Sequence, residues 1–147
     1  TQRLQNLETD VLAYLQGPFG IFLGTQPSAP QLWVAGGIGI TPFIAELRAH
    51  ARHQPTTLIY LFRNHTDAAF LDELAALAKT DPAFELLTHA SEQGLPNYPV
   101  LLEKISQLSA REINICGPKP MVDALLPHLR QRGISERAIH FEKFDFR

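Results

Sequence analysis

Short apolar runs alternate with longer amphipathic segments along most of this 147-residue sequence. The short runs are rich in β-branched and aromatic residues, as strands are. The longer segments repeat their apolar positions every three or four residues, as helices do. The expected strands are 32–35, 57–62, 84–88, 112–116 and 138–146, and the expected helices are 42–53, 67–79, 100–108 and 121–129.

Strands that alternate with helices of this length imply βαβ units, whose helices cover both faces of a parallel sheet. We therefore predict an α/β fold, doubly wound, with a mainly parallel five-stranded sheet. Ligands of such sheets bind beyond the carboxyl ends of the strands, where the strand order reverses. Functional residues are expected in the loops that follow the strands.

Residues 1–30 depart from this pattern. A strand-like run at 11–15 ends in the turn signal Gly17-Pro18-Phe19-Gly20, and a proline-rich connection follows at 25–30. Residues 11–45 carry no charge, but prolines and glutamines interrupt them, so they do not predict a membrane span. We expect 31–147 to form the α/β domain, with 1–30 outside it as a segment that ends in a linker.

Composition and charge exclude several classes of function. The chain is 45% hydrophobic and 19% charged, as soluble globular domains are. Its net charge of −2 argues against a nucleic-acid partner. The single cysteine, Cys116, excludes an internal disulfide, and the histidines lack the spacing of metal ligands. No apolar leader opens the chain, and we expect a cytoplasmic protein without a metal site.

A glycine-rich loop, residues 35–42, follows the first predicted strand. Its glycines let the backbone approach a ligand closely. Thr41 is suited to the N-cap of the next helix and Pro42 to its first turn, which would aim free N–H groups at a pyrophosphate. Pro42 stands where the usual dinucleotide fingerprint has its third glycine, so a tight turn without a ligand fits as well. The glycines concerned are Gly36, Gly37 and Gly39.

Arg63 and Asn64 follow the second predicted strand. Folds that bind an unphosphorylated ribose often place an acidic residue here. An arginine can instead hold a 2′-phosphate through charge-assisted hydrogen bonds, and His89 or Ser91 after the third strand could assist. A solvated arginine at a strand end is the alternative.

A third loop, Cys116 to Met121, lies between a predicted strand and a helix and includes Gly117 and Pro118. A thiol in this position can contact a ligand ring, although a lone cysteine is also common in protein cores. The last predicted strand carries Glu142 and Phe144 on one face. Phe144 could stack on a planar cofactor or belong to a half-buried edge strand.

Together these motifs resemble the ferredoxin–NADP reductase superfamily, over nearly the whole chain. The matching segments, in the family's order, are Gly17-Pro18-Phe19-Gly20, 35–42, Arg63 with 67–74, Cys116-Gly117-Pro118 and Glu142-Lys143-Phe144. The resemblance implies that 31–147 is the NAD(P)H-binding domain of a flavin-dependent oxidoreductase and that 1–30 ends its flavin domain. The family's flavin motif Arg-x-Tyr-Ser is absent, so FAD would be held mainly by a missing domain and this chain alone would be inactive.

The resemblance also implies residue roles. Gly37, Gly39 and Thr41 would hold the pyrophosphate and nicotinamide ribose, and Arg63 would lie near the adenosine, which favours NADPH over NADH. Cys116, Glu142 and Phe144 are the expected catalytic residues, where hydride leaves the nicotinamide for the flavin. The remaining expected cofactor-binding residues are Gly36, Pro42, Asn64, Gly117, Pro118 and Met121.

Residues 140–147 resemble the end of bacterial membrane ferric reductases related to NADPH oxidases. That likeness implies haem in a membrane domain of the full-length protein, with this chain as the cytoplasmic part of an inner-membrane protein. A soluble ferredoxin or flavodoxin reductase, or an oxygenase reductase component, would share the same motifs. A non-catalytic nucleotide-sensing module is the alternative of another class. It is disfavoured because the strand ends lack clustered acidic residues.

Overall fold

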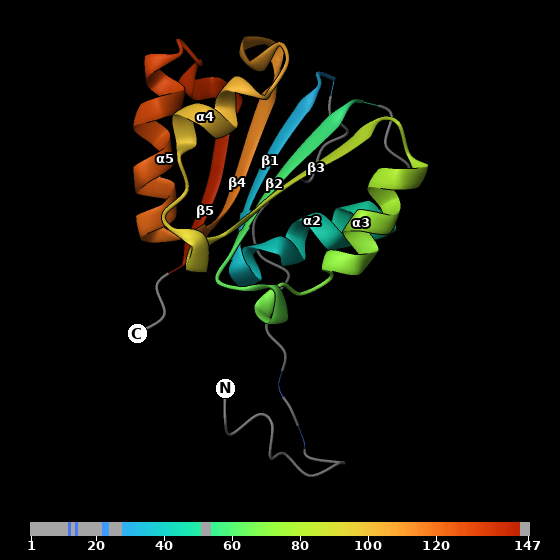
Figure 1. Cartoon of the computed structure of the whole chain (residues 1–147). Helices are drawn as coiled ribbons and strands as arrows, with labels where there is room; N and C mark the ends of the chain where they lie inside the picture. The colour runs from blue at the N-terminus through green and yellow to red at the C-terminus, as the bar shows by residue number, and fades with distance from the viewer. Residues whose placement is uncertain (1–11, 13, 15–21, 24–27, 51–53, 145–147) are drawn as a thin grey trace.

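A single parallel sheet forms the middle layer of the structure (Figure 1). The computed structural model describes residues 12, 14, 22–23, 28–50 and 54–144. The strand order is β3-β2-β1-β4-β5 and every neighbouring pair is parallel. This confirms the doubly wound α/β fold. The strands are β1 (Gln31–Gly36), β2 (Thr56–Phe62), β3 (Phe84–Ala90), β4 (Glu112–Pro118) and β5 (Ile139–Phe144), and the helices are α2 (Thr41–Ala49), α3 (Leu71–Thr80), α4 (Tyr98–Glu103) and α5 (Lys119–Gln131).

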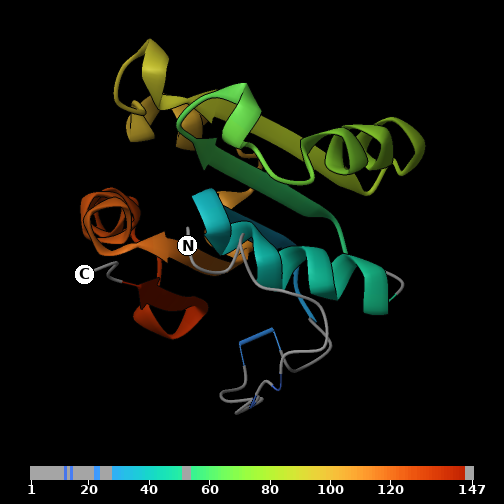
Figure 2. The same cartoon turned by 90° about the horizontal axis from the view of Figure 1, so that it is seen from below.

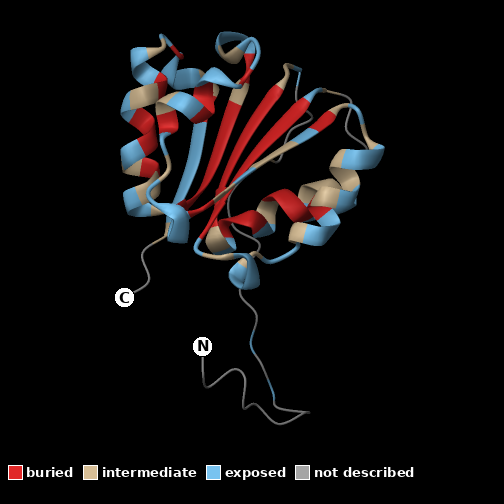
Figure 3. Cartoon of the chain, viewed as in Figure 1, coloured by how far each residue is buried: buried red, intermediate tan, exposed pale blue. Residues whose placement is uncertain are grey.

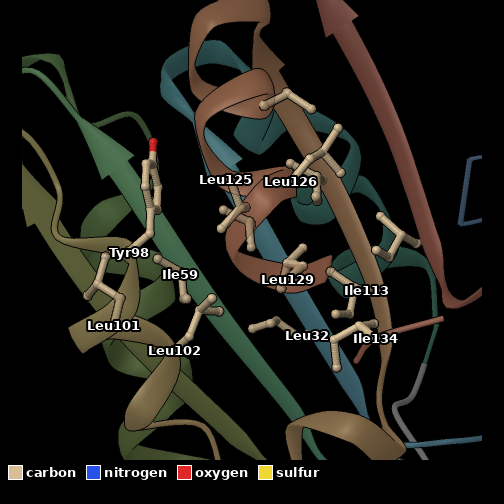
Figure 4. Packing of buried hydrophobic residues seen from close by; sticks show 14 of the residues in the cluster. Leu32, Ile59, Tyr98, Leu101, Leu102, Ile113, Leu125, Leu126, Leu129 and Ile134 are labelled. Carbon is tan, nitrogen blue, oxygen red and sulfur yellow. The ribbon is translucent and has the colours of Figure 1, made fainter. Parts of the chain in front are cut away.

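Two hydrophobic cores lie on opposite faces of the sheet because successive side chains of a strand point to opposite sides. Leu32 and Val34 of β1 pack in one core with α4 and α5, whereas Trp33 and Ala35 pack in the other with α2 and α3. The two helix pairs lie on either side of the sheet when it is seen from below (Figure 2). The central strands are buried along their length (Figure 3), and leucines of α4 and α5 cover one face (Figure 4).

The start of α2 differs from the expectation. A short 3₁₀ helix, Gly37–Ile40, runs directly into α2, so Ile40 occupies the N-cap and Thr41 is already helical. The Thr41 hydroxyl donates to the carbonyl of Ile38 at 3.0 Å instead of capping α2. The prediction of Thr41 as the N-cap was therefore wrong, because the chain begins to coil one turn earlier than the glycines suggested.

Two other helices also start away from their expected positions. Asn64 forms the cap of a separate 3₁₀ helix, His65–Asp67, and α3 begins only at Leu71, after Phe70 has taken a left-handed conformation with φ +61°. Helix α4 begins earlier than expected, at Tyr98, because the Asn97 side chain accepts from the backbone N–H of Val100 at 3.2 Å.

Several predictions about the chain ends lie outside the described residues, including the strand-like run at 11–15, most of 1–30, and Phe146. Where the structure does describe this region, Phe22 packs edge-to-face on Phe43 of α2, with ring centroids 5.7 Å apart. Within the described residues, no helix has the length and apolar character needed to cross a lipid bilayer.

Arg111 ties together the amino ends of the strands. It is buried and donates to the carbonyl of Gln31 at 2.7 Å and to the carbonyl of Ser106 at 2.9 Å. Asn114 donates to the side chain of Gln31 at 3.0 Å in the same network. These hydrogen bonds satisfy polar groups that would be costly to bury alone. The loops that carry the candidate functional residues lie at the opposite, carboxyl edge of the sheet.

Candidate functional site

The strand order reverses between β1 and β4. From β1 the chain continues to β2 and β3 on one side of the sheet, and β4 and β5 lie on the other. The glycine-rich loop follows β1 and the Cys116 loop ends β4, so loops far apart in sequence meet at one point of the carboxyl edge. The register places Ala35 beside Cys116, and Cys116 beside Glu142. This is the position at which open α/β sheets bind their ligands.

Gly39 packs directly against the backbone of β4. A methyl group added to it would lie 2.6 Å from the carbonyl carbon of Cys116 and 3.0 Å from the nitrogen of Gly117. No side chain fits there without moving one of the two backbones. Gly39 is therefore needed for contact between the β1 loop and β4, a reason that the sequence did not reveal.

Glycine occupies the two other positions of this loop, 36 and 37, for different physical reasons. A methyl group at Gly36 would lie 2.9 Å from Cδ of Pro118 and 3.2 Å from Cε of Met121, so Gly36 lets the β4–α5 connection approach. Gly37 has φ +54°, which favours glycine, and has open space where a side chain would be. The backbone at Gly37 is thus accessible to a ligand.

One hollow, here called the Cys116 hollow, lies beside the 3₁₀ helix and has a volume of about 480 Å³. It brings together six of the residues that the sequence analysis selected, from the glycine-rich loop with the start of α2, from the end of β4 and from β5. Ile38, which the sequence analysis did not select, also lines it. Its lining is Ile38, Gly39, Thr41, Pro42, Cys116, Glu142 and Phe144.

Cys116 presents a neutral thiol to this hollow. Cys116 is buried, with only 5% of its surface exposed to solvent. Burial, and secondarily the negative charge of Glu142, raise the pKa of the Cys116 thiol to about 11. At neutral pH the group is therefore a small, uncharged packing surface and a poor nucleophile. Such a surface can lie against a planar ring without chemical attack on it.

A second hollow, here called the Arg63 hollow, lies at the same edge and has a volume of about 700 Å³. Both volumes fall in the range of about 300–1,000 Å³ that is usual for small-molecule sites. Most of the lining is apolar, with Arg63, His89 and Ser91 as the polar members. The lining is Gly36, Gly37, Leu61, Phe62, Arg63, His89, Ser91, Leu95, Pro96, Tyr98, Pro118, Pro120, Met121 and Ala124.

Arg63 is positioned by its backbone and keeps its side chain available. Its carbonyl accepts from the backbone N–H of Glu92 at 3.0 Å, which links the loop after β2 to the end of β3. Among the described residues, no carboxylate forms an ion pair with Arg63. The exposed guanidinium at the hollow can therefore bind an anion without first breaking a salt bridge.

Asn64, which the sequence analysis expected to bind the cofactor, forms hydrogen bonds within its own turn. Its side-chain oxygen accepts from the backbone N–H of Asp67 at 2.9 Å and from the hydroxyl of Thr66 at 2.6 Å, and its amide donates to Asp67. Asn64 lines neither hollow. Asn and Asp side chains often cap turns in this way, so Asn64 holds the loop in shape.

The sequence analysis named Ser91 in the loop between β3 and α4 but missed Leu95, Pro96 and Tyr98, which also line the Arg63 hollow. The sequence does indicate that this loop starts at the carboxyl edge of the sheet, because the turn Gly94-Leu95-Pro96 follows a predicted strand. It does not indicate which residues of the loop reach the hollow. Gly117 does not line either hollow but packs between Gly36 and Met121, where an added methyl group would lie 3.0 Å from the Met121 sulfur.

The comparisons with known proteins agree with this geometry. The family described as "Oxidoreductase NAD-binding domain" matches residues 33–126. The toluate 1,2-dioxygenase electron transfer component of Pseudomonas putida is 33% identical over an alignment of 139 residues. The match covers 88% of this chain and 41% of that protein. The carnitine monooxygenase reductase subunit of Acinetobacter pittii is 31% identical over 130 residues, 86% of this chain and 40% of that protein. The chain thus spans about two fifths of the length of these relatives.

Solved structures share the fold. A cytochrome P450 reductase of Amycolatopsis superposes with a TM-score of 0.72 at 27% identity, over 92% of this chain and 46% of that one. The cytochrome b5 reductase domain of Ulva prolifera nitrate reductase gives a TM-score of 0.81 at 22% identity, over 96% of this chain and 62% of that one. The family match covers most of the sheet and its helices, and the chain belongs to the oxidoreductase NAD-binding domain family of ferredoxin reductase type.

Proposed function

We propose that this chain is the NAD(P)H-binding half of a flavin-dependent reductase that passes electrons to an oxygenase system. The observation that carries the proposal is the pair of hollows at the strand-order reversal, both lined in part by the glycine-rich loop. The glycine-rich loop contributes Gly36 and Gly37 to one hollow and Gly39 to the other. A dinucleotide has two lobes joined by a pyrophosphate, and this arrangement offers a place for each part.

Each part of the dinucleotide has a matching surface. The pyrophosphate fits at the accessible backbone of Gly37 and at the start of the 3₁₀ helix, because the first N–H groups of a helix have no partner within it. The adenosine fits the apolar Arg63 hollow. The nicotinamide fits the Cys116 hollow, where the neutral thiol and Phe144 offer packing surfaces and Glu142 offers a hydrogen-bond acceptor.

The catalytic contribution of this chain is positioning. The bound cofactors supply hydride transfer, and the protein orients them and excludes competing groups. Glu142 and Phe144 lie on β5 at the open rim of the Cys116 hollow, where a flavin domain would approach the nicotinamide. No catalytic base is required of Cys116, which fits its raised pKa.

NADPH is the proposed coenzyme. A 2′-phosphate on the adenosine ribose would meet the exposed guanidinium of Arg63, with His89 and Ser91 in the same hollow. The planar guanidinium suits phosphate because it donates two parallel hydrogen bonds. NADH would leave this cation without a partner, and we expect it to bind more weakly.

The relatives support an oxygenase component as the electron acceptor. The dioxygenase electron transfer component and the monooxygenase reductase subunit favour an oxygenase partner over the membrane ferric reductase that residues 140–147 suggested. Assays of the full-length protein distinguish the two: NAD(P)H-dependent reduction of a ferredoxin or oxygenase component is expected to exceed reduction of a ferric chelate. A faster reaction with the ferric chelate would favour the membrane reductase.

Nucleotide fragments test the coenzyme without a flavin. Calorimetric titration is expected to show about tenfold tighter binding of 2′,5′-ADP than of 5′-AMP, a difference of about 1.4 kcal/mol. Arg63→Ala should remove this preference, and Arg137→Ala, which removes an exposed arginine that lines neither hollow, should retain it. Equal binding of the two nucleotides would move the proposal to NADH. Failure to bind either would contradict the dinucleotide site.

A further inference from the structure

Leu95 is a large apolar residue whose side chain is exposed to solvent. It is 90% exposed although it lines the Arg63 hollow. An exposed leucine is unremarkable by itself, but one at the rim of an otherwise apolar hollow is placed to be covered by whatever enters. The exposure therefore points to a contact that forms only with a ligand.

The loop that carries Leu95 is fixed at both ends. Gly94 has φ +115°, a conformation open essentially to glycine, and its N–H donates to the carbonyl of Ser91 at 3.0 Å. The ring Nε2 of His89 lies 2.9 Å from the carbonyl of Gly94 and must donate to it, since a carbonyl only accepts. On the other side Asn97 caps α4. The position of Leu95 is therefore set by hydrogen bonds of its neighbours and not by burial of its own side chain.

The other lining residues of the hollow indicate the kind of occupant. Tyr98 and Met121 offer apolar surface, and Tyr98 directs its hydroxyl away from the leucines of the core (Figure 4). Arg63 adds one positive charge to the same hollow. An occupant with a flat apolar ring and a negatively charged group matches this lining, and an adenosine phosphate has both.

We propose that Leu95 clamps the adenine base of the bound dinucleotide against the floor formed by Tyr98 and Met121. This inference rests on the proposed dinucleotide site and assigns it a residue that determines affinity. The preformed loop lowers the cost of ordering the clamp on binding. Because the base is gripped by apolar contact, Leu95 contributes to binding of NADH and NADPH alike, whereas Arg63 discriminates between them.

Titration of the chain with ADP tests the clamp. Leu95→Ala is expected to bind ADP roughly five- to tenfold more weakly, the effect of losing contact with a largely covered leucine. Leu95→Met keeps the apolar reach and should bind within twofold of wild type. Val100→Ala, which shortens another exposed apolar side chain just inside α4 and outside the hollow, is the matched control and should also bind within twofold.

Nuclear Overhauser effects from labelled Leu95 methyl groups to the adenine H2 or H8 proton are expected in the ADP complex. Wild-type affinity of Leu95→Ala, or strong ADP binding without these effects, would overturn the clamp and leave the dinucleotide site intact. Failure of the wild-type chain to bind ADP would overturn the clamp together with the proposed function.

Discussion

Replacement of Gly39 by alanine tests how tightly the β1 loop packs on β4. The added methyl group would lie 2.6 Å from the carbonyl carbon of Cys116 and 3.0 Å from the nitrogen of Gly117, well inside normal contact distance. Both neighbours are backbone atoms of a central strand, so they cannot rotate away as a side chain would. The clash must be relieved by moving the 3₁₀ helix Gly37–Ile40 or the end of β4.

The expected cost is about 3 kcal/mol, at the upper end of the usual range for overpacking, because neither backbone can yield cheaply. That is a large share of the roughly 5–15 kcal/mol by which domains of this kind are stable. With a denaturant slope of about 1–3 kcal/mol per molar urea, the unfolding midpoint should fall by about 1–3 M. Equilibrium urea unfolding, followed by circular dichroism, measures the shift.

Gly37→Ala is the matched control. An alanine there meets no atom within 4 Å, and its cost is only the left-handed φ of +54°, about 1–2 kcal/mol. Gly39→Ala should therefore be clearly the less stable variant. A loss of stability no larger than that of Gly37→Ala would refute the close approach of the loop to β4.

Two further predictions concern buried groups. Since the pKa of Cys116 is raised from its ordinary 9.0 to about 11, alkylation by iodoacetamide at pH 8 should be about a hundredfold slower than for a free thiol. Because the thiol of the unfolded chain loses its proton at lower pH than the folded one, the free energy of unfolding should fall between about pH 9 and 11. The Cys116→Ala variant should show a smaller fall over the same range. Rapid alkylation or an unchanged pH profile would contradict the buried neutral thiol. Arg111→Met leaves the carbonyls of Gln31 and Ser106 without their donor and should cost about 3 kcal/mol in thermal or urea unfolding. Its 2′,5′-ADP affinity should stay near that of wild type, because Arg111 lies at the opposite edge of the sheet.

The sequence predicted the sheet well because its signals there are local. Short apolar runs such as 57–62 match β2 to within one residue, since a strand buried on both faces must be apolar throughout. The alternation of strands with helices then determines a parallel sheet and places the loops at one edge. That Cys116, Glu142 and Phe144 lie close together could be predicted on that basis, together with the family resemblance.

The differences from expectation arose where the conformation depends on contacts that the hydrophobic pattern does not show, either between distant segments or within a single turn. Thr41 looked like an N-cap, but packing of Gly39 on β4 draws the chain into a 3₁₀ helix first. Asn64 looked available for a ligand, but its amide is used by its own turn. The place of Leu95 at the Arg63 hollow depends on where β3 lies in the sheet, which the local pattern does not specify.

Backbone amide shifts during titration with NADPH test the dinucleotide site most directly. The account predicts changes centred on Gly37, Gly39 and Cys116 at the strand-order reversal, extending to Arg63 and its neighbours. Amides at the amino ends of the strands, within 111–114, should stay unchanged. Shifts confined to one hollow would contradict a dinucleotide that spans both. Shifts centred on the amino ends of the strands, or none at millimolar NADPH, would contradict the assignment of this edge as a nucleotide site.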